Sequence, residues 1–277
     1  MRRKGRRKRS GNNKMFDAEI FSIGTEILMG RIMDTNSPWL ASNILSIGGE
    51  IRRITILPDT IEEVSSAIRE AIRRGPMFLI ITGGLGPTPD DITVDAICSA
   101  LKVGKFLHEP TLETFMERRG IGRDQVTQSM LKMATVPEGA EVLVNPVGWA
   151  PCIKIKAGKT TIFSMPGPPR EMKAIFREHI MPFLLSLNMG KRMVRRAFVH
   201  MSESEISPIM EEIMSSFPGT YLKAYVSLRR SHDEPLPVDI VISGDDEEGT
   251  RRKMEEVIEK IEEMVRGKGK RIEVEHG

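Results

Sequence analysis

The chain has 277 residues, of which 29% are charged and 40% hydrophobic, and its formal net charge is +3 at pH 7. This length suits two domains, because a single core usually stops growing at about 250–300 residues. No apolar run is long enough to span a membrane, and only Cys98 and Cys152 occur, without metal-binding spacing. We therefore expect a cytoplasmic protein without a membrane partner or a disulfide framework.

A basic segment opens the chain. Residues 1–14 hold eight Lys or Arg and no acidic residue, which leaves 33 basic against 38 acidic residues in the remainder. The segment lacks apolar periodicity, so we expect a disordered tail over residues 1–15. A nucleic-acid partner for this tail is one interpretation. An extension without a role, or a start codon assigned ahead of Met15, is the interpretation we favour, since a charge run says little about a specific partner.

Strand and helix patterns alternate in the first part of the chain. The predicted strands cover 18–23, 50–57, 78–82, 141–144, 151–155 and 160–164. The predicted helices cover 38–47, 93–101, 109–119 and 125–133, and a further long helix runs to about Leu187. One more helix is predicted after Thr60 and Glu63, which have the spacing of a capping box. This alternation predicts a three-layer α/β/α domain over residues 16–188, with a mostly parallel sheet.

The pattern changes after residue 190. The predicted order is strand 193–200, helix 204–215, strands 220–228 and 237–242, helix 246–266 and strand 270–275. In the second of these strands Leu222, Ala224, Val226 and Leu228 alternate with polar residues and Tyr, which predicts one buried face. The order βαββαβ predicts a small ferredoxin-like α+β domain over residues 191–277.

The segment from Phe78 to Asp95 is the most informative about function. An apolar strand runs into a glycine cluster, followed by two prolines and two adjacent carboxylates at a helix start. Gly83, Gly84 and Gly86 allow a ligand to approach the backbone, and the N–H groups of a helix's first turn attract phosphate. The segment therefore predicts an anion-binding loop.

Asp90 and Asp91 would repel a phosphate unless a cation lies between them. A hard, oxygen-seeking ion such as Mg²⁺ would remove this conflict. The alternative is that one aspartate caps the helix and Asp95 stabilises its first turn. Capping leaves the preceding glycine cluster unexplained, so we favour a ligand site.

Polar residues also follow the other predicted strands. Ligands of open α/β sheets gather at the carboxyl ends of the strands, so these residues should converge. Those we consider are Gly24, Thr25, Glu26, Asp34, Asn36, Asp59, Gly167 and Arg170. Arg170 could clamp a phosphate, and Trp149 could stack on a planar ring. The alternatives are turn or loop hydrogen bonding for Asp59, Glu26 and Asp34, pairing with a carboxylate for Arg170, and packing for Trp149.

Four motifs resemble the CinA family and cover the MoaB/MogA-type molybdopterin-binding domain that opens those proteins. The motifs span residues 23–36, 82–93, 145–151 and 165–172. The segment after Lys191 resembles the small α/β domain that follows in CinA-like proteins. At Cys152 the family pattern usually has Gly.

The resemblance implies a MogA-like fold that binds a phosphorylated pterin or nucleotide. In bacterial CinA this domain is associated with metal-dependent ADP-ribose pyrophosphatase activity, and MogA-type relatives adenylylate molybdopterin. By motif position, Asp59 and Asp91 match the two functional aspartates, and Gly83, Gly84 and Gly86 match the phosphate loop. The chain ends before the nicotinamide-mononucleotide deamidase domain of CinA, so we expect no deamidase activity. Family members commonly self-associate, so we expect a homo-oligomer.

These inferences combine into one hypothesis. We expect a metal-dependent hydrolase of a nucleoside-diphosphate compound such as ADP-ribose; the alternative is a protein that binds molybdopterin or a nucleotide without chemistry. The predicted catalytic residues are Asp59 and Asp91, and the predicted Mg²⁺ ligands are Asp59, Asp90 and Asp91. The predicted ligand-binding residues are Thr82, Gly83, Gly84, Gly86, Thr88, Thr93, Gly24, Thr25, Glu26, Asn36, Gly167 and Arg170.

Overall fold

The computed structural model describes residues 15–187, 189–229, 231 and 234–275. The basic segment before Met15 lies outside these residues. The chain divides into two compact units. We call Phe16–Leu45 with Gly49–Asn188 the larger unit, and the part that contains the residues from Met189 onward the smaller unit.

The larger unit is built on a six-stranded sheet. Its order is β2 (Glu50–Leu57), β1 (Asp17–Ile23), β3 (Phe78–Thr82), β8 (Thr160–Met165), β7 (Cys152–Ala157) and β6 (Glu141–Leu143). The first four strands run parallel, and β7 and β6 continue the sheet antiparallel. Every residue of β1 and β3 is buried, as expected for parallel strands covered on both faces. The prediction of a mostly parallel sheet is confirmed.

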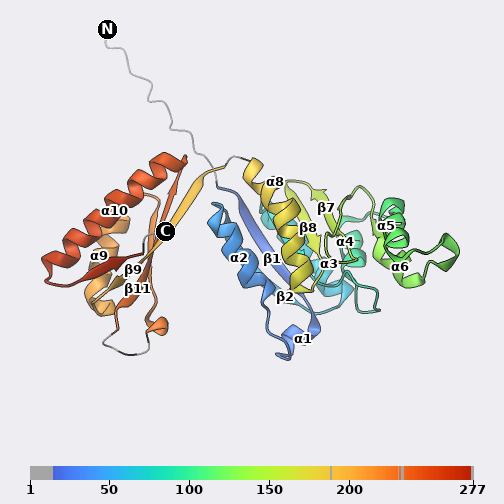
Figure 1. Cartoon of the computed structure of the whole chain (residues 1–277), viewed down its shortest axis with the longest axis horizontal. Helices are drawn as coiled ribbons and strands as arrows, with labels where there is room; N and C mark the ends of the chain where they lie inside the picture. The colour runs from blue at the N-terminus through green and yellow to red at the C-terminus, as the bar shows by residue number, and fades with distance from the viewer. Residues whose placement is uncertain (1–14, 188, 230, 232–233, 276–277) are drawn as a thin grey trace, which may run out of the picture. The chain divides into compact units, whose positions relative to one another are not determined.

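Helices cover both faces of this sheet (Figure 1). On one face lie α2 (Asn36–Ser46) and α8 (Met181–Ser186), and Phe183 of α8 contacts Phe78 and Phe163 of the sheet. On the other face α3 (Ile61–Arg74) and α4 (Thr93–Leu101) pack their buried residues against Leu79 and Ile81 of β3. The predicted three-layer α/β/α architecture is therefore present.

The long helix predicted to run to about Leu187 is interrupted. It consists of α7 (Pro169–Ile175), a π-helical turn η2 (Phe176–Ile180) and α8. Pro182 lies in the first turn of α8. A proline ring clashes with the carbonyl four residues earlier and has no N–H to donate, and the wider π turn accommodates both effects.

Three short elements of the larger unit escaped prediction: α1 (Thr25–Leu28), β4 (Lys105–Leu107) and β5 (Thr135–Pro137). The strands β4 and β5 pair antiparallel at the base of a helical excursion of α5 (Glu109–Arg119), the turn η1 (Arg123–Gln125) and α6 (Gln128–Ala134). Elements of three or four residues are too short to show a hydrophobic period.

The predicted capping box at Thr60 and Glu63 is wrong. Thr60 precedes α3, but its side chain makes no capping hydrogen bond. The backbone N–H of Thr60, which Glu63 would accept in a capping box, instead donates to the Pro58 carbonyl at 2.8 Å.

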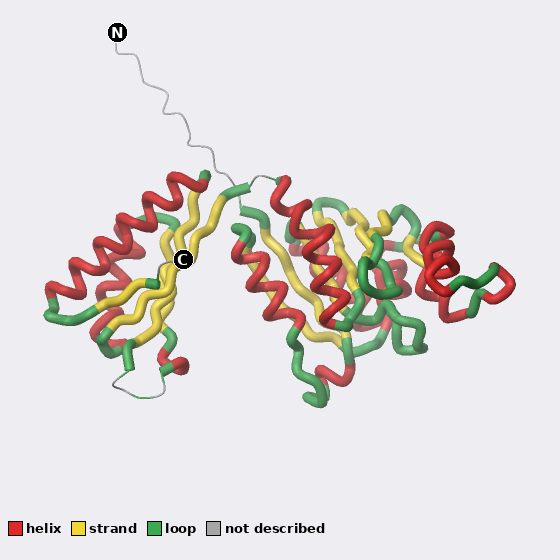
Figure 2. The backbone as a smooth tube through the Cα atoms, in the orientation of Figure 1, coloured by secondary structure: helices red, strands yellow, loops and turns green. Residues whose placement is uncertain are grey.

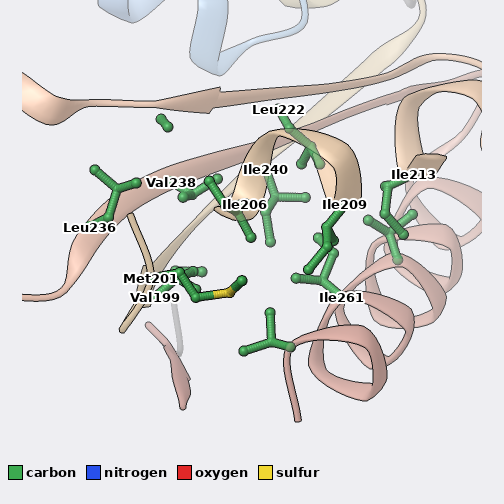
Figure 3. Packing of buried hydrophobic residues seen from close by; sticks show 14 of the residues in the cluster. Val199, Met201, Ile206, Ile209, Ile213, Leu222, Leu236, Val238, Ile240 and Ile261 are labelled. Atoms are coloured by element: carbon green, nitrogen blue, oxygen red, sulfur yellow. The ribbon is translucent and has the colours of Figure 1, made fainter. Parts of the chain in front are cut away.

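The smaller unit has the predicted βαββαβ order. Its helices lie beside its strands (Figure 2). Its elements are β9 (Lys191–Val199), α9 (Glu203–Ser216), β10 (Thr220–Ala224), the turn η3 (Val226–Leu228), β11 (Leu236–Gly244), α10 (Glu247–Gly267) and β12 (Ile272–Val274). The strands form an antiparallel sheet in the order β10, β11, β9, β12. Figure 3 shows apolar side chains of the helices and strands meeting in one core. Within the described residues, no helix has both the length and the apolar character needed to cross a bilayer.

The strand predicted over 220–228 ends at Ala224. Ala224 pairs with Val238, so the next pair would join Tyr225 to Pro237. Tyr225 donates to the Pro237 carbonyl at 2.9 Å, but proline has no N–H for the reciprocal bond, and the ladder stops. Val226 and Leu228, predicted to face the core, are exposed instead.

Candidate functional site

The loops that leave β1, β2, β3 and β8 line a cleft of about 430 Å³ in the larger unit. Many of the residues predicted for the site lie in its lining. They are Gly24, Glu26, Asp59, Gly83, Gly84, Gly86, Asp90, Asp91 and Gly167. The residues expected at the carboxyl ends of the parallel strands therefore lie around one cleft.

The glycine loop is held close to its neighbours. Gly83 and Gly84 have positive φ angles of 105° and 67°. A Cβ atom on Gly83 would lie 2.3 Å from the carbonyl oxygen of Ile23, and one on Gly84 would lie 2.3 Å from the Thr93 hydroxyl. Glycine is thus required at both positions by backbone conformation and by packing.

Three buried polar residues brace these loops from behind. The Thr93 hydroxyl donates to the Gly83 carbonyl at 2.8 Å, and its N–H donates to the Gly84 carbonyl at 3.0 Å. The Asn36 amide donates to the Thr82 hydroxyl at 3.1 Å and to the Gly167 carbonyl at 2.8 Å. Asn36, Thr82 and Thr93 were predicted to contact the ligand, but none of them lines the cleft. In the structure they fix the positions of the loops that do.

Asp59 and Thr25 join the exits of β2 and β1. Asp59 Oδ2 accepts the backbone N–H of Thr25 at 2.7 Å, and the Asp59 N–H donates to the Thr25 hydroxyl at 3.1 Å. Asp59 Oδ1 makes no hydrogen bond to the described residues and remains available to a ligand or an ion.

Asp91 is also held by a threonine, Thr88, which here donates both of its hydrogen bonds to the carboxylate. Asp91 Oδ2 accepts the backbone N–H of Thr88 at 2.8 Å and its hydroxyl at 2.6 Å. The helix α4 begins after Ile92, which provides no side-chain cap. The alternative in which Asp90 or Asp91 serves as the helix cap is therefore wrong.

The lining of the cleft is strongly acidic. Its carboxylates are those of Glu26, Asp59, Asp90, Asp91 and Glu171. The Thr88 hydroxyl, the backbone N–H of Asp90 itself and, more weakly, the Lys132 ammonium lower the pKa of the Asp90 carboxyl. Like charges gathered at one site are costly unless they are solvated or hold a cation. Among the described residues, however, no group of three His, Cys, Asp or Glu side chains is arranged to coordinate one metal ion.

The cleft also contains residues that sequence analysis did not assign to it. Arg119, from the end of α5, and Glu171, from the start of α7, both line it, whereas the predicted Arg170 is exposed and lies outside the lining. The local sequence pattern could not show that the end of α5 lies beside the loops that follow the strands, because this contact joins residues far apart in the sequence. Glu171 could have been found, since it follows Arg170 in the same strand–loop–helix motif.

The loop from Asn145 to Pro151 forms one wall of the cleft. Asn145 Oδ1 accepts the Gly148 N–H at 2.8 Å, and its amide donates to Glu171 Oε2 at 2.6 Å. Trp149 packs edge-on against Phe115, with 5.6 Å between the ring centroids. The Arg119 guanidinium lies 5.0 Å from the centroid of the Trp149 ring. Trp149 therefore lines the cleft while it also packs against α5.

Comparison with known proteins shows the family to which this chain belongs. The family model described as "Probable molybdopterin binding domain" matches residues 19–186, which contain the whole cleft. The chain belongs to this family. Protein PAE0875 of Pyrobaculum aerophilum is 40% identical over 213 residues, covering 75% of this chain and 79% of its own. Protein PH0439 of Pyrococcus horikoshii is 35% identical over 266 residues, covering 91% of this chain and 95% of its own.

A solved structure extends this family assignment to the three-dimensional fold. The protein CinA with unknown function from Thermoplasma acidophilum is 31% identical, with a TM-score of 0.55. The match covers 59% of this chain and 95% of that protein. The family's MogA/MoaB-like α/β fold, predicted from the motifs, is thereby confirmed.

Proposed function

We propose that the larger unit binds a phosphorylated pterin or nucleotide in its acidic cleft. The observation that carries this proposal is the convergence of the glycine loop with Asp59, Asp90 and Asp91 on one cleft of about 430 Å³. That volume falls in the usual range for small-molecule sites, about 300–1,000 Å³. Membership of the molybdopterin-binding family supports the ligand class. The likeness to the Thermoplasma CinA structure supports a place among CinA-like proteins.

A divalent cation such as Mg²⁺ belongs to this proposal. Asp59 and Asp91 each engage one carboxylate oxygen with a threonine and leave Oδ1 available. The Asp90 carboxylate is ionised at neutral pH, as an ordinary aspartate is, and its lowered pKa extends the ionised range to more acidic pH. Carboxylate oxygens are ligands that Mg²⁺ prefers, so Asp59, Asp90 and Asp91 would supply its ligands. Among the described residues these three side chains do not already converge on one point, so ion binding would have to draw them together. When bound, it would offset the charge of a phosphate and lower the pKa of bound water.

The reaction we propose for this site is hydrolysis of a nucleoside-diphosphate compound such as ADP-ribose. A water oxygen forms a bond to phosphorus, the phosphoanhydride P–O bond breaks, and the water gives up a proton to solvent or to a carboxylate. The products are AMP and ribose 5-phosphate. The protein would contribute a fixed glycine loop beside the phosphates and aspartates whose positions are set before the ligand arrives.

Release of AMP from ADP-ribose tests this proposal. We expect release to require a divalent cation and to fall by about 100-fold or more in Asp91→Asn. Asp95→Asn is the matched control, because Asp95 pairs with Lys105 and does not line the cleft. Release without a cation, or full activity in Asp91→Asn, would contradict the mechanism.

A second candidate function is binding without chemistry. It is favoured by the lack, among the described residues, of three ligating side chains already arranged around one point. Calorimetry that shows binding of a pterin or nucleotide, together with no AMP release under any cation, would select this function.

A further inference from the structure

The cationic side chain in the lining of the acidic cleft is that of Arg119. An arginine near several carboxylates commonly pairs with one of them. Arg119 instead lies over the Trp149 ring, and no ion pair joins it to an acidic side chain of the described residues. The contact with the ring uses no N–H donor of Arg119 in a hydrogen bond to a described residue, so these donors remain available.

The position of Arg119 is fixed from two directions. The neighbouring Arg118 donates to the carbonyls of Gly148 at 2.5 Å and Asn145 at 3.0 Å, which ties the end of α5 to the loop of Trp149. Trp149 in turn packs on Phe115 of the same helix. The arginine and its aromatic support are therefore held at the cleft by one helix.

A guanidinium in this position matches the chemistry of a phosphate group. Its planar donors form two parallel hydrogen bonds to phosphate oxygens, which an ammonium group cannot do. Arg119 is the cationic side chain among the carboxylates of the lining, so a ligand phosphate gains a direct contact with positive charge where Arg119 lies. Arg170, suggested by the sequence for this role, is outside the lining.

We propose that Arg119, which lies over the Trp149 ring, binds a phosphate of the ligand and so makes the cleft selective for phosphorylated over unphosphorylated nucleosides. This inference rests on the proposed function, because it assigns one contact within the same cleft. It makes Arg119 a specificity residue supplied by the helical excursion α5–α6 rather than by the strand-exit loops.

Calorimetry with three probes in the presence of Mg²⁺ tests the inference. AMP and ADP-ribose carry phosphate, and adenosine does not. We expect Arg119→Ala to weaken binding of AMP and ADP-ribose by about 10- to 100-fold, as for loss of a charge-assisted hydrogen bond, and to leave adenosine binding unchanged. Arg119→Lys should fall between Arg119→Ala and the unmodified protein. Arg170→Ala is the matched control and should change each affinity less than two-fold.

The outcomes separate this inference from the proposed function. If the unmodified protein binds neither AMP nor ADP-ribose, the proposed nucleotide-binding and hydrolytic function fails and the inference fails with it. If the unmodified protein binds both and Arg119→Ala binds them equally well, only the inference is overturned. Equal weakening of adenosine and AMP binding would also overturn it, because a general loss of the cleft wall would then explain the result.

Discussion

The two units differ in what they bury. Among the described residues, the buried polar side chains lie in the larger unit with the exception of Thr250. Several of them, including Asn36, Thr82, Thr93 and Asn145, hold loops around the acidic cleft. The core of the smaller unit is apolar, contributed by one face of its sheet and by its two helices. Burying a polar group costs free energy, and in the larger unit the buried Asn36 amide and Thr93 hydroxyl donate to the loops around the cleft. This difference marks the larger unit as the one that builds a site.

The strongest test of this comparison removes core volume from the smaller unit. Ile240 is fully buried in β11, and Ile240→Ala should destabilise that unit by about 2–5 kcal/mol through the cavity it leaves. Denaturant unfolding measures this loss, and calorimetry should show that AMP binding by the larger unit is unchanged. Val194→Ala is the control, because Val194 is 47% exposed. Loss of ligand binding in Ile240→Ala would show that the two units do not act separately.

A change in the glycine loop should have a smaller effect on stability and a direct effect on the site. Gly83→Ala combines a φ of 105° with a Cβ only 2.3 Å from a backbone oxygen. We expect a stability loss of about 1–3 kcal/mol from strain, and weaker AMP binding as the loop shifts. Gly158→Ala is the matched control, since its φ is 62° and no atom lies within 4 Å of the added Cβ. Equal loss of AMP binding in the two variants would disprove the importance of the close approach to Ile23.

The smallest effect concerns a surface carboxylate of the smaller unit. Glu205 accepts the N–H and hydroxyl of Ser202 at 2.8 and 2.9 Å and pairs with Lys270, and these contacts lower its pKa to about 2. A lowered pKa means that the ionised form stabilises the fold at higher pH. This contribution should disappear as the pH falls from about 4.5 through about 2.

Glu205→Gln should therefore flatten the acid limb of the stability curve for the smaller unit. Thermal unfolding measured from about pH 2 to about pH 6, a range that covers the titration of Glu205, shows the effect. Glu203→Gln, in the same first turn of α9, is the control. An unchanged acid limb in Glu205→Gln would mean that the capping contacts do not contribute to stability in solution.

Most of the architecture could be predicted because its long elements carry clear periods. The buried strands around Phe21 and Ile80, and the apolar stripe of α10, each left a pattern in the sequence. The turn at η3 could not be predicted, since Val226 and Leu228 continue the alternation of β10 and only the pairing with Pro237 ends the strand. Local pattern does not contain that cross-strand information.

The site was predictable to the extent that it follows strand exits. Asp59, Asp90, Asp91 and Glu26 all follow strands or their loops, and they converge on one cleft. The distinction between lining and bracing residues was not predictable. Thr93 has the residue type of a ligand contact, yet its hydroxyl is already used by the Gly83 carbonyl. Only the three-dimensional contacts separate these two roles.

The outer border of the larger unit's sheet has a consequence for solubility. The strand β2, eight residues long, pairs only with β1 within that sheet, so the main-chain groups on its other side have no strand partner there. Arg53 is exposed near the middle of this border, whereas Arg52 pairs with Asp17, and two copies brought together would set the Arg53 side chains against each other. The opposite border, β6, has only three residues. Edge-to-edge pairing of two such sheets is thus disfavoured by charge at β2 and by the short length of the edge strand at β6.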